Sequence, residues 1–142
     1  MKYDDASWHY GGNFPTDLPA EAGATHIGMF VAWAWLTGLA GADVMDDMPE
    51  AVTALNERTT TPGKSFFDNC DGKFVDDDLN AVGNAFAVEY FDFKNGQYLN
   101  DYDELLTGDL PTVYHVPDTW ESFDRLRPRL DERYREWSTR NL

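Results

Sequence analysis

Apolar side chains recur at helical spacing in several stretches of the chain, and the longest stretch predicts a central helix. Over residues 24–39, large apolar residues recur every three or four positions, and Met29 and Trp33 widen the apolar stripe nearly all round. Gly38 and Gly41 end the helix, because glycine is favoured just beyond a helix terminus. A helix that is apolar on almost every side is expected at the centre of the domain.

Three further helices are predicted in the middle of the chain. Asp46 or Asp47 can cap a second helix that runs to about Thr59, and a short helix follows over residues 64–69. Residues 77–91 carry apolar side chains on one face and predict a third long helix.

The last third of the chain predicts one short and one long helix with an extended stretch between them. Residues 102–106 favour a single helical turn, and residues 112–116 are β-branched and aromatic before a proline, which favours an extended backbone. Asp118 or Thr119 opens the last helix, and Pro128 inside its apolar pattern predicts a kink or a break.

The first 22 residues have no regular period. They contain four aromatic residues, and glycines and prolines divide them into turns, so we expect an irregular segment that packs against the helical body. The chain has no repeat or linker. The fold expected is therefore mainly α: a single domain over residues 1–142, a helical bundle of about four to five helices with little or no β structure.

Composition adds a strong negative charge to this picture. Among 142 residues, 26 are acidic and 11 are basic, a net charge of −15, while an aromatic content of 15% argues against disorder. Such a surface repels phosphates and anionic lipid, so direct nucleic acid or membrane binding is not expected, and it attracts basic proteins. The most apolar stretch is too short to span a membrane, and the N-terminus lacks a secretion signal, so a cytoplasmic location is expected.

The charge is unevenly distributed. Residues 1–124 hold 23 acidic and 5 basic residues, a net of −18, whereas residues 125–142 hold 6 arginines and 3 acidic residues, a net of +3. Either the arginines pair with the acidic body, or they form a separate basic face. The candidate residues for contact with a basic partner are the N-terminal aromatic triplet and the acidic clusters: Trp8, His9, Tyr10, Asp43, Asp46, Asp47, Asp71, Asp76, Asp77, Asp78, Asp101, Asp103 and Glu104.

No motif predicts a catalytic, cofactor or metal site. His9, His26 and His115 do not share a spacing that places two of them on one helix face, although a site could assemble in three dimensions. His26 is interpreted as a structural histidine at the start of the apolar helix, and His9 as part of a recognition patch or of the packing of the N-terminal segment. Acidic neighbours of Cys70 disfavour a nucleophilic thiolate. Residues 69–78 approach a calcium-loop pattern but lack its first ligand, and carboxylates at a helix N-terminus explain them better.

Several segments together resemble a family of uncharacterised bacterial proteins: Tyr3–Gly12 (YDDASWHYGG), Phe14-Pro15, Gly23–Phe30 (GATHIGMF) with Trp33, Thr61–Gly63, Asp71–Phe74 with Leu79-Asn80, Gly83–Phe86 and Val113–Val116. The resemblance implies a short cytoplasmic domain and supplies no catalytic or ligand-binding residues. By size and charge such proteins are similar to bacterial immunity proteins, which neutralise a cognate toxin by binding it.

Three functions therefore remain open. The leading hypothesis is an immunity-type protein that occludes a basic toxin domain. The first alternative is a small-ligand-binding protein or enzyme whose site assembles from His9, His26, His115 and carboxylates. The second is a structural subunit of a homo-oligomer, which would expose a large apolar patch.

Overall fold

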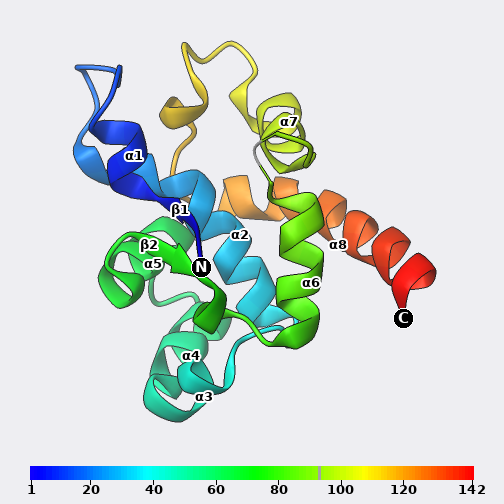
Figure 1. The fold of residues 1–142 in the computed structure, drawn as a ribbon. Helices are drawn as coiled ribbons and strands as arrows, with labels where there is room; N and C mark the ends of the chain where they lie inside the picture. Colours follow the sequence, from blue (N-terminus) through cyan, green and yellow to red (C-terminus); the bar gives the residue numbers. More distant parts are fainter. Residues whose placement is uncertain (93) are drawn as a thin grey trace.

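The structure is a computed structural model that describes residues 1–92 and 94–142. The described residues form a mainly α single domain with one small sheet, which confirms the expected fold class (Figure 1). The elements in chain order are β1 (Lys2–Asp5), α1 (Ala6–Tyr10), η1 (Ala20–Ala24), α2 (Thr25–Leu36), α3 (Ala42–Asp47), α4 (Pro49–Glu57), α5 (Pro62–Cys70), β2 (Lys73–Val75), η2 (Asp76–Asp78), α6 (Ala81–Tyr90), α7 (Tyr98–Tyr102), η3 (Asp103–Thr107), η4 (Val113–His115) and α8 (Trp120–Asn141).

Helix α2 lies at the centre of the domain, as its apolar pattern predicts. Eleven of its twelve residues are buried, and it packs against α4, α5 and α8 (Figure 1). Its contact with α5 is very close, because a Cβ added at Gly28 would lie 2.6 Å from the carbonyl oxygen of Pro62. The two helix backbones can approach this closely only because position 28 has no side chain.

Aromatic rings fill the core around α2. The ring centroid of Phe30 lies 5.0 Å from that of Phe91, 5.3 Å from that of Tyr98 and 5.7 Å from that of Trp33. These rings come from α2, α7 and the end of α6, so one continuous core joins elements from across the chain. Tilted and edge-to-face pairs at these distances stabilise a core beyond their buried area.

The N-terminal segment packs on the body as expected, but it is more regular than its sequence predicts. Strand β1 pairs antiparallel with β2, with Asp4 opposite Phe74. The side chain of Asp5 accepts a hydrogen bond from the backbone N–H of Ser7 at 2.9 Å and caps α1. The partner of β1 lies about seventy residues away in sequence, which is why local pattern did not reveal the strand.

The helix predicted to start at Asp46 or Asp47 is two helices. Both aspartates lie inside α3, and neither caps α4. The backbone of Met48 leaves the helical region, with φ −140° and ψ 53°, and Pro49 then occupies the first turn of α4. A proline is favoured there because its missing N–H would have no helical partner.

The helix predicted over residues 77–91 begins later, at Ala81. Its cap is Asn80, whose side-chain oxygen accepts a hydrogen bond from the backbone N–H of Gly83 at 2.8 Å. The three aspartates before it form the separate 3-10 turn η2. The domain therefore has more and shorter helices than the four to five expected.

In the last third of the chain, two details differ from expectation. The stretch 112–116, expected to be extended, contains the 3-10 turn η4. Helix α8 begins after its cap Thr119 and continues through Pro128 without a break. Pro128 and Asp124, whose carbonyl loses its helical partner, are both exposed, so water can replace the missing hydrogen bond. Among the described residues, no helix combines the length and apolar character needed to cross a membrane.

Candidate functional site

The N-terminal segment brings two polar side chains to the first turn of α2. Asp4 lies on β1, and His9 lies on α1, one turn after its cap. His26 is the second residue of α2 and is 2% exposed. The pairing of β1 with β2 and the start of α1 therefore fix the positions of Asp4 and His9 relative to His26.

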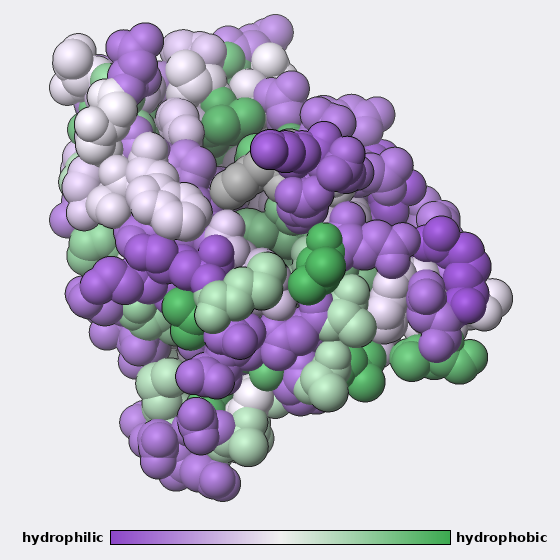
Figure 2. All heavy atoms as spheres, in the orientation of Figure 1, coloured by the Kyte–Doolittle hydropathy of each residue, from purple (hydrophilic) through white to green (hydrophobic). Residues whose placement is uncertain are grey.

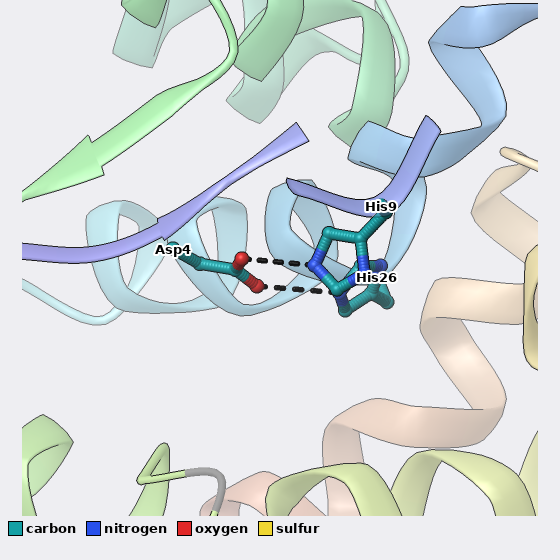
Figure 3. A group of neighbouring side chains, drawn as sticks. All are labelled: Asp4, His9 and His26. Carbon is teal, nitrogen blue, oxygen red and sulfur yellow. Dashed lines mark hydrogen bonds and ion pairs between the residues drawn. The ribbon is translucent and has the colours of Figure 1, made fainter. Parts of the chain in front are cut away.

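Asp4, His9 and His26 form one compact cluster, and Figure 3 shows both imidazole rings beside the Asp4 carboxylate. Nε2 of His9 lies 2.8 Å from Oδ1 of Asp4, within hydrogen-bond distance. Nε2 of His26 lies 3.3 Å from Oδ2 of Asp4, within ion-pair distance but without the alignment of a hydrogen bond. One ligand atom from each residue lies within 4.8 Å of the other two.

This cluster contains polar atoms without a hydrogen-bond partner among the described residues. They are Oδ2 of Asp4 and both ring nitrogens of His26. A buried polar group left without a partner costs about 1–3 kcal/mol. In native cores such groups usually bind a water or an ion, so the cluster has capacity for a further ligand.

The charges in the cluster follow from burial and contact. Burial alone would raise the pKa of Asp4, but the adjacent His26 and His9 outweigh it and hold that pKa below its usual range. Burial is also the main reason that the pKa of His26 is lowered, against the opposing effect of Asp4. At neutral pH the cluster therefore holds an ionised carboxylate beside a neutral imidazole, an arrangement that can accept a proton or a cation.

Tyr114 connects this cluster to the surface. Its hydroxyl lies 2.6 Å from Nδ1 of His9, on the side of the ring away from Asp4. Tyr114 and Thr25 line a surface hollow of about 530 Å³, and Tyr114 also lines a neighbouring hollow of about 430 Å³ beside Phe14. The first volume falls in the range typical of small-molecule sites.

His115 does not join the other two histidines. Its Nδ1 lies 2.9 Å from the hydroxyl of Thr112, and its Nε2 lies 3.0 Å from the carboxylate of Asp17. The structure thus brings together two of the three histidines of the sequence hypothesis, and it adds Asp4 and Tyr114, which sequence analysis missed. Asp4 lies a few residues before the Trp8-His9-Tyr10 triplet in sequence, but its sequence separation from His26 and Tyr114 does not predict that these residues lie close together.

Several of the acidic partner-contact candidates form one exposed surface. Four exposed carboxylates make up this acidic α3 surface: Asp43, Asp46, Asp47 and Asp77. Helix α3 lies beside η2, because the backbone N–H of Gly41 donates to the carbonyl of Asp78 at 3.1 Å. Within the described residues, none of the four carboxylates has an ion-pair partner. Figure 2 shows hydrophilic side chains dominating the lower end of the molecule, where Figure 1 draws α3 and α4.

Of the remaining candidates between α5 and α6, Asp76 and Asp78 are less available than Asp71. The N-terminal amine lies 3.2 Å from the carboxylate of Asp76. Asp78 is buried and accepts a hydrogen bond from the backbone N–H of Val75 at 2.9 Å. Burial is the main cause that raises the pKa of Asp78 to about 6. Asp71 is exposed, with the amine of Lys73 at 3.4 Å.

Asp101 is buried and serves the fold. It accepts hydrogen bonds from the hydroxyl of Tyr90 at 2.6 Å, from Arg129 at 2.7 Å and from Arg133 at 2.9 and 3.1 Å. Arg129 also contacts the exposed Glu104 at 3.0 Å. Arg129 and Arg133 therefore bind the acidic body and hold α7 to α8, and Arg140 lies 3.9 Å from Glu89, in line with the first interpretation of the charge distribution.

The N-terminal aromatic candidates remain open to solvent. Trp8 is 54% exposed and Tyr10 is 40% exposed. The amine of Lys2 lies 5.0 Å from the centre of the Trp8 ring. Both aromatic side chains are on α1, which Figure 1 draws at the end of the molecule away from α3, so they do not belong to the acidic α3 surface. Asp103 is exposed on η3 and has no ion-pair partner within the described residues.

The exposed large apolar side chains do not favour the homo-oligomer hypothesis. Apart from Trp8 and Tyr10, which share α1, those of the described residues lie on different segments or at the chain ends: Met1, Trp8, Tyr10, Met45, Val88, Leu110 and Leu142.

Fold and site together define a mainly α domain that is built around an apolar helix and carries a buried Asp–His–His cluster. Residues 2–116 match the family model described as a domain of unknown function, DUF7832. The match spans most of the chain, and the chain belongs to this family. It includes the Asp4–His9–His26 cluster, Tyr114 and α3, and it ends before α8. No curated protein and no solved structure matched the chain.

Proposed function

We propose that this protein is a cytosolic, immunity-type binding protein that neutralises a basic protein partner, a toxin domain, by occluding it. The observation that carries the proposal is the acidic α3 surface. Its four carboxylates are exposed, adjacent and without cationic partners in the described part of the chain. A basic patch on another protein is the partner that such a surface attracts.

The overall charge supports this choice of partner. The net charge is −15, and two arginines of α8 bind Asp101 within the chain. Figure 1 draws the C-terminal end of α8 at the right of the molecule and α3 at its lower left, so the arginines at that end of α8 lie away from the acidic α3 surface. A field of this sign raises the association rate with a basic protein by about 10- to 1,000-fold at low salt.

Trp8 and Tyr10 supply a second contact on a large partner. Aromatic side chains are over-represented among residues that dominate binding energy. Because these two lie on α1, a partner reaching both them and the acidic α3 surface would have to cover the length of the β1–β2 sheet (Figure 1). A smaller partner would use the acidic α3 surface alone.

The test begins with the tagged full chain purified from its native cells at low salt and again at about 0.5 M salt, where surface charge is strongly screened. The retained protein is identified by mass spectrometry, produced separately and tested for toxicity with and without this chain. We expect a basic protein that is retained at low salt and whose toxicity the chain suppresses. Retention of no partner, or of one whose activity is unaffected, contradicts the proposal.

Variants then locate the binding surface. The triple variant D43N/D46N/D47N should reduce the association rate by at least about 10-fold at low salt, with little change at high salt. The control D109N/E121Q/E132Q removes the same number of charges from exposed positions elsewhere. Equal effects of the two triple variants would show that net charge, and not the acidic α3 surface, drives association.

A small-ligand function is the second candidate, and the Asp4–His9–His26 cluster favours it. Tyr114 places this cluster next to a hollow of about 530 Å³. A panel of small polar molecules, followed by changes in the amide NMR signals of Thr25 and Tyr114, tests this candidate. Signals that stay unchanged across the panel remove its support.

A further inference from the structure

Oδ2 of Asp4 and the ring nitrogens of His26 have no hydrogen-bond partner among the described residues, which indicates a further ligand. We propose that Asp4, His9 and His26 bind one divalent transition-metal ion of the Zn²⁺ class where β1, α1 and α2 meet (Figure 3). This inference is independent of the proposed partner, because the acidic α3 surface contributes none of the three ligands.

The spacing of the ligand atoms suits one ion. Zinc binds imidazole nitrogen and carboxylate oxygen at about 2.0–2.2 Å, and in a tetrahedral site neighbouring ligand atoms then lie about 3.4 Å apart. Here the two Nε2–Oδ distances to Asp4 are 2.8 and 3.3 Å, and all three ligand atoms fall within 4.8 Å of one another. Small rotations of the side chains would place them around a single centre.

The donor set selects the class of metal. Two imidazole nitrogens and one carboxylate suit zinc, iron and neighbouring divalent ions, whereas Mg²⁺ and Ca²⁺ prefer oxygen ligands alone. All three donors converge at one place, because the Asp4 carboxylate contacts both imidazole rings.

The surroundings of His9 match those of a metal ligand. With Nε2 on the metal, its Nδ1–H donates to the hydroxyl of Tyr114 at 2.6 Å. Metal-binding histidines commonly donate their second ring N–H to an oxygen, which fixes the ring orientation. Tyr114 thus acts as a positioning residue for His9.

A metal at this place would join the N-terminal segment to the core. Asp4 and His9 belong to that segment, and His26 belongs to the central helix α2. Since a ligand that binds only the folded state stabilises it, metal binding should stabilise the attachment of β1 and α1 to α2. The alternative is a site that holds only a buried water, and such a site would not bind Zn²⁺ stoichiometrically.

The direct test uses the full chain freed of metal with a chelator and then titrated with Zn²⁺ alone. We expect one Zn²⁺ per chain by elemental analysis after dialysis, and visible absorption from Co²⁺ bound in its place. We also expect Zn²⁺ to raise Tm by roughly 5–10 °C. Absence of stoichiometric Zn²⁺ binding would overturn the proposal and favour a buried water.

Variants assign the binding to these residues. H26N and D4N should each weaken Zn²⁺ binding by at least about 100-fold and remove the Tm shift. H9N provides the same test at a partly exposed position, in case the buried variants do not fold. The control is H115N, because His115 also contacts a carboxylate but lies outside the cluster. Zn²⁺ binding that persists in H9N, or that is lost in H115N, contradicts the assignment.

Discussion

Replacing Asp101 with Asn should strongly destabilise the fold. The carboxylate accepts four hydrogen bonds, three of them from the guanidinium groups of Arg129 and Arg133 and one from Tyr90. Removing one partner of a buried ion pair costs about 3–5 kcal/mol. The two arginine side chains are 24% exposed and can be partly rehydrated. We therefore expect a loss of about 2–3 kcal/mol, or a fall in Tm of roughly 10 °C.

The effect of D101N should depend on pH. Burial alone would raise the pKa of Asp101, but Arg133, Tyr90 and Arg129 outweigh it and hold the pKa below its usual range. A carboxyl group whose pKa is lower in the folded than in the unfolded chain stabilises the fold at pH values above its unfolded pKa of about 3.9. This stabilisation is lost as pH falls through the pKa of the folded state. The difference between wild type and variant should therefore be full at pH 7 and shrink below about pH 4.

Urea unfolding followed by circular dichroism measures both quantities. The control is D103N, which removes a charge from an exposed neighbour without an ion-pair partner in the described residues and should change stability by less than about 0.5 kcal/mol. If D101N also changes the free energy of unfolding by less than about 0.5 kcal/mol, or if its effect is the same at low pH, the description of this buried network is wrong.

Two further predictions concern packing and a buried carboxylate. G28A should lower the free energy of unfolding by about 1–3 kcal/mol, because its Cβ would lie 2.6 Å from the carbonyl oxygen of Pro62. The control G12A should change it little, because the nearest contacts of a Cβ at position 12 are at 3.9 Å. A G28A variant as stable as the wild type would contradict the close contact between α2 and α5. Burial raises the pKa of Asp78 to about 6. Because the unfolded chain has a lower value, of about 3.9, this group lowers the free energy of unfolding of the wild type as pH rises from about 4 to 6. D78N lacks this titration, so its free energy of unfolding should rise by about 2–3 kcal/mol relative to that of the wild type between these two pH values. Urea unfolding at several pH values checks this, and a constant difference between the two proteins would refute it.

The sequence predicted those parts of the fold that depend on local pattern. The apolar run of α2 predicted its central position, and the last helix begins after Thr119, one of the two caps that the sequence offered with Asp118. Pro128 suggested a kink or break where the helix continues, because its exposure to water is a tertiary property. Strand β1 was missed because its stability depends on pairing with the distant β2.

The candidate site was only partly predictable for the same reason. His9 stood out within its aromatic triplet, but its contact with His26 requires β1 and α1 to fold back onto α2. Asp4 looked like one carboxylate among many until its burial between two imidazoles distinguished it. Asp101 was expected on the surface because sequence alone does not reveal which acidic residue the α8 arginines cover.

The most direct test of the proposed function is hydrogen exchange of the full chain with and without its purified toxic partner. The proposal predicts that binding slows exchange of backbone amides in α3 and η2, and that this protection weakens in D43N/D46N/D47N but not in D109N/E121Q/E132Q. Protection centred on α8, with α3 and η2 exchanging at the same rate in the free and bound protein, would contradict it.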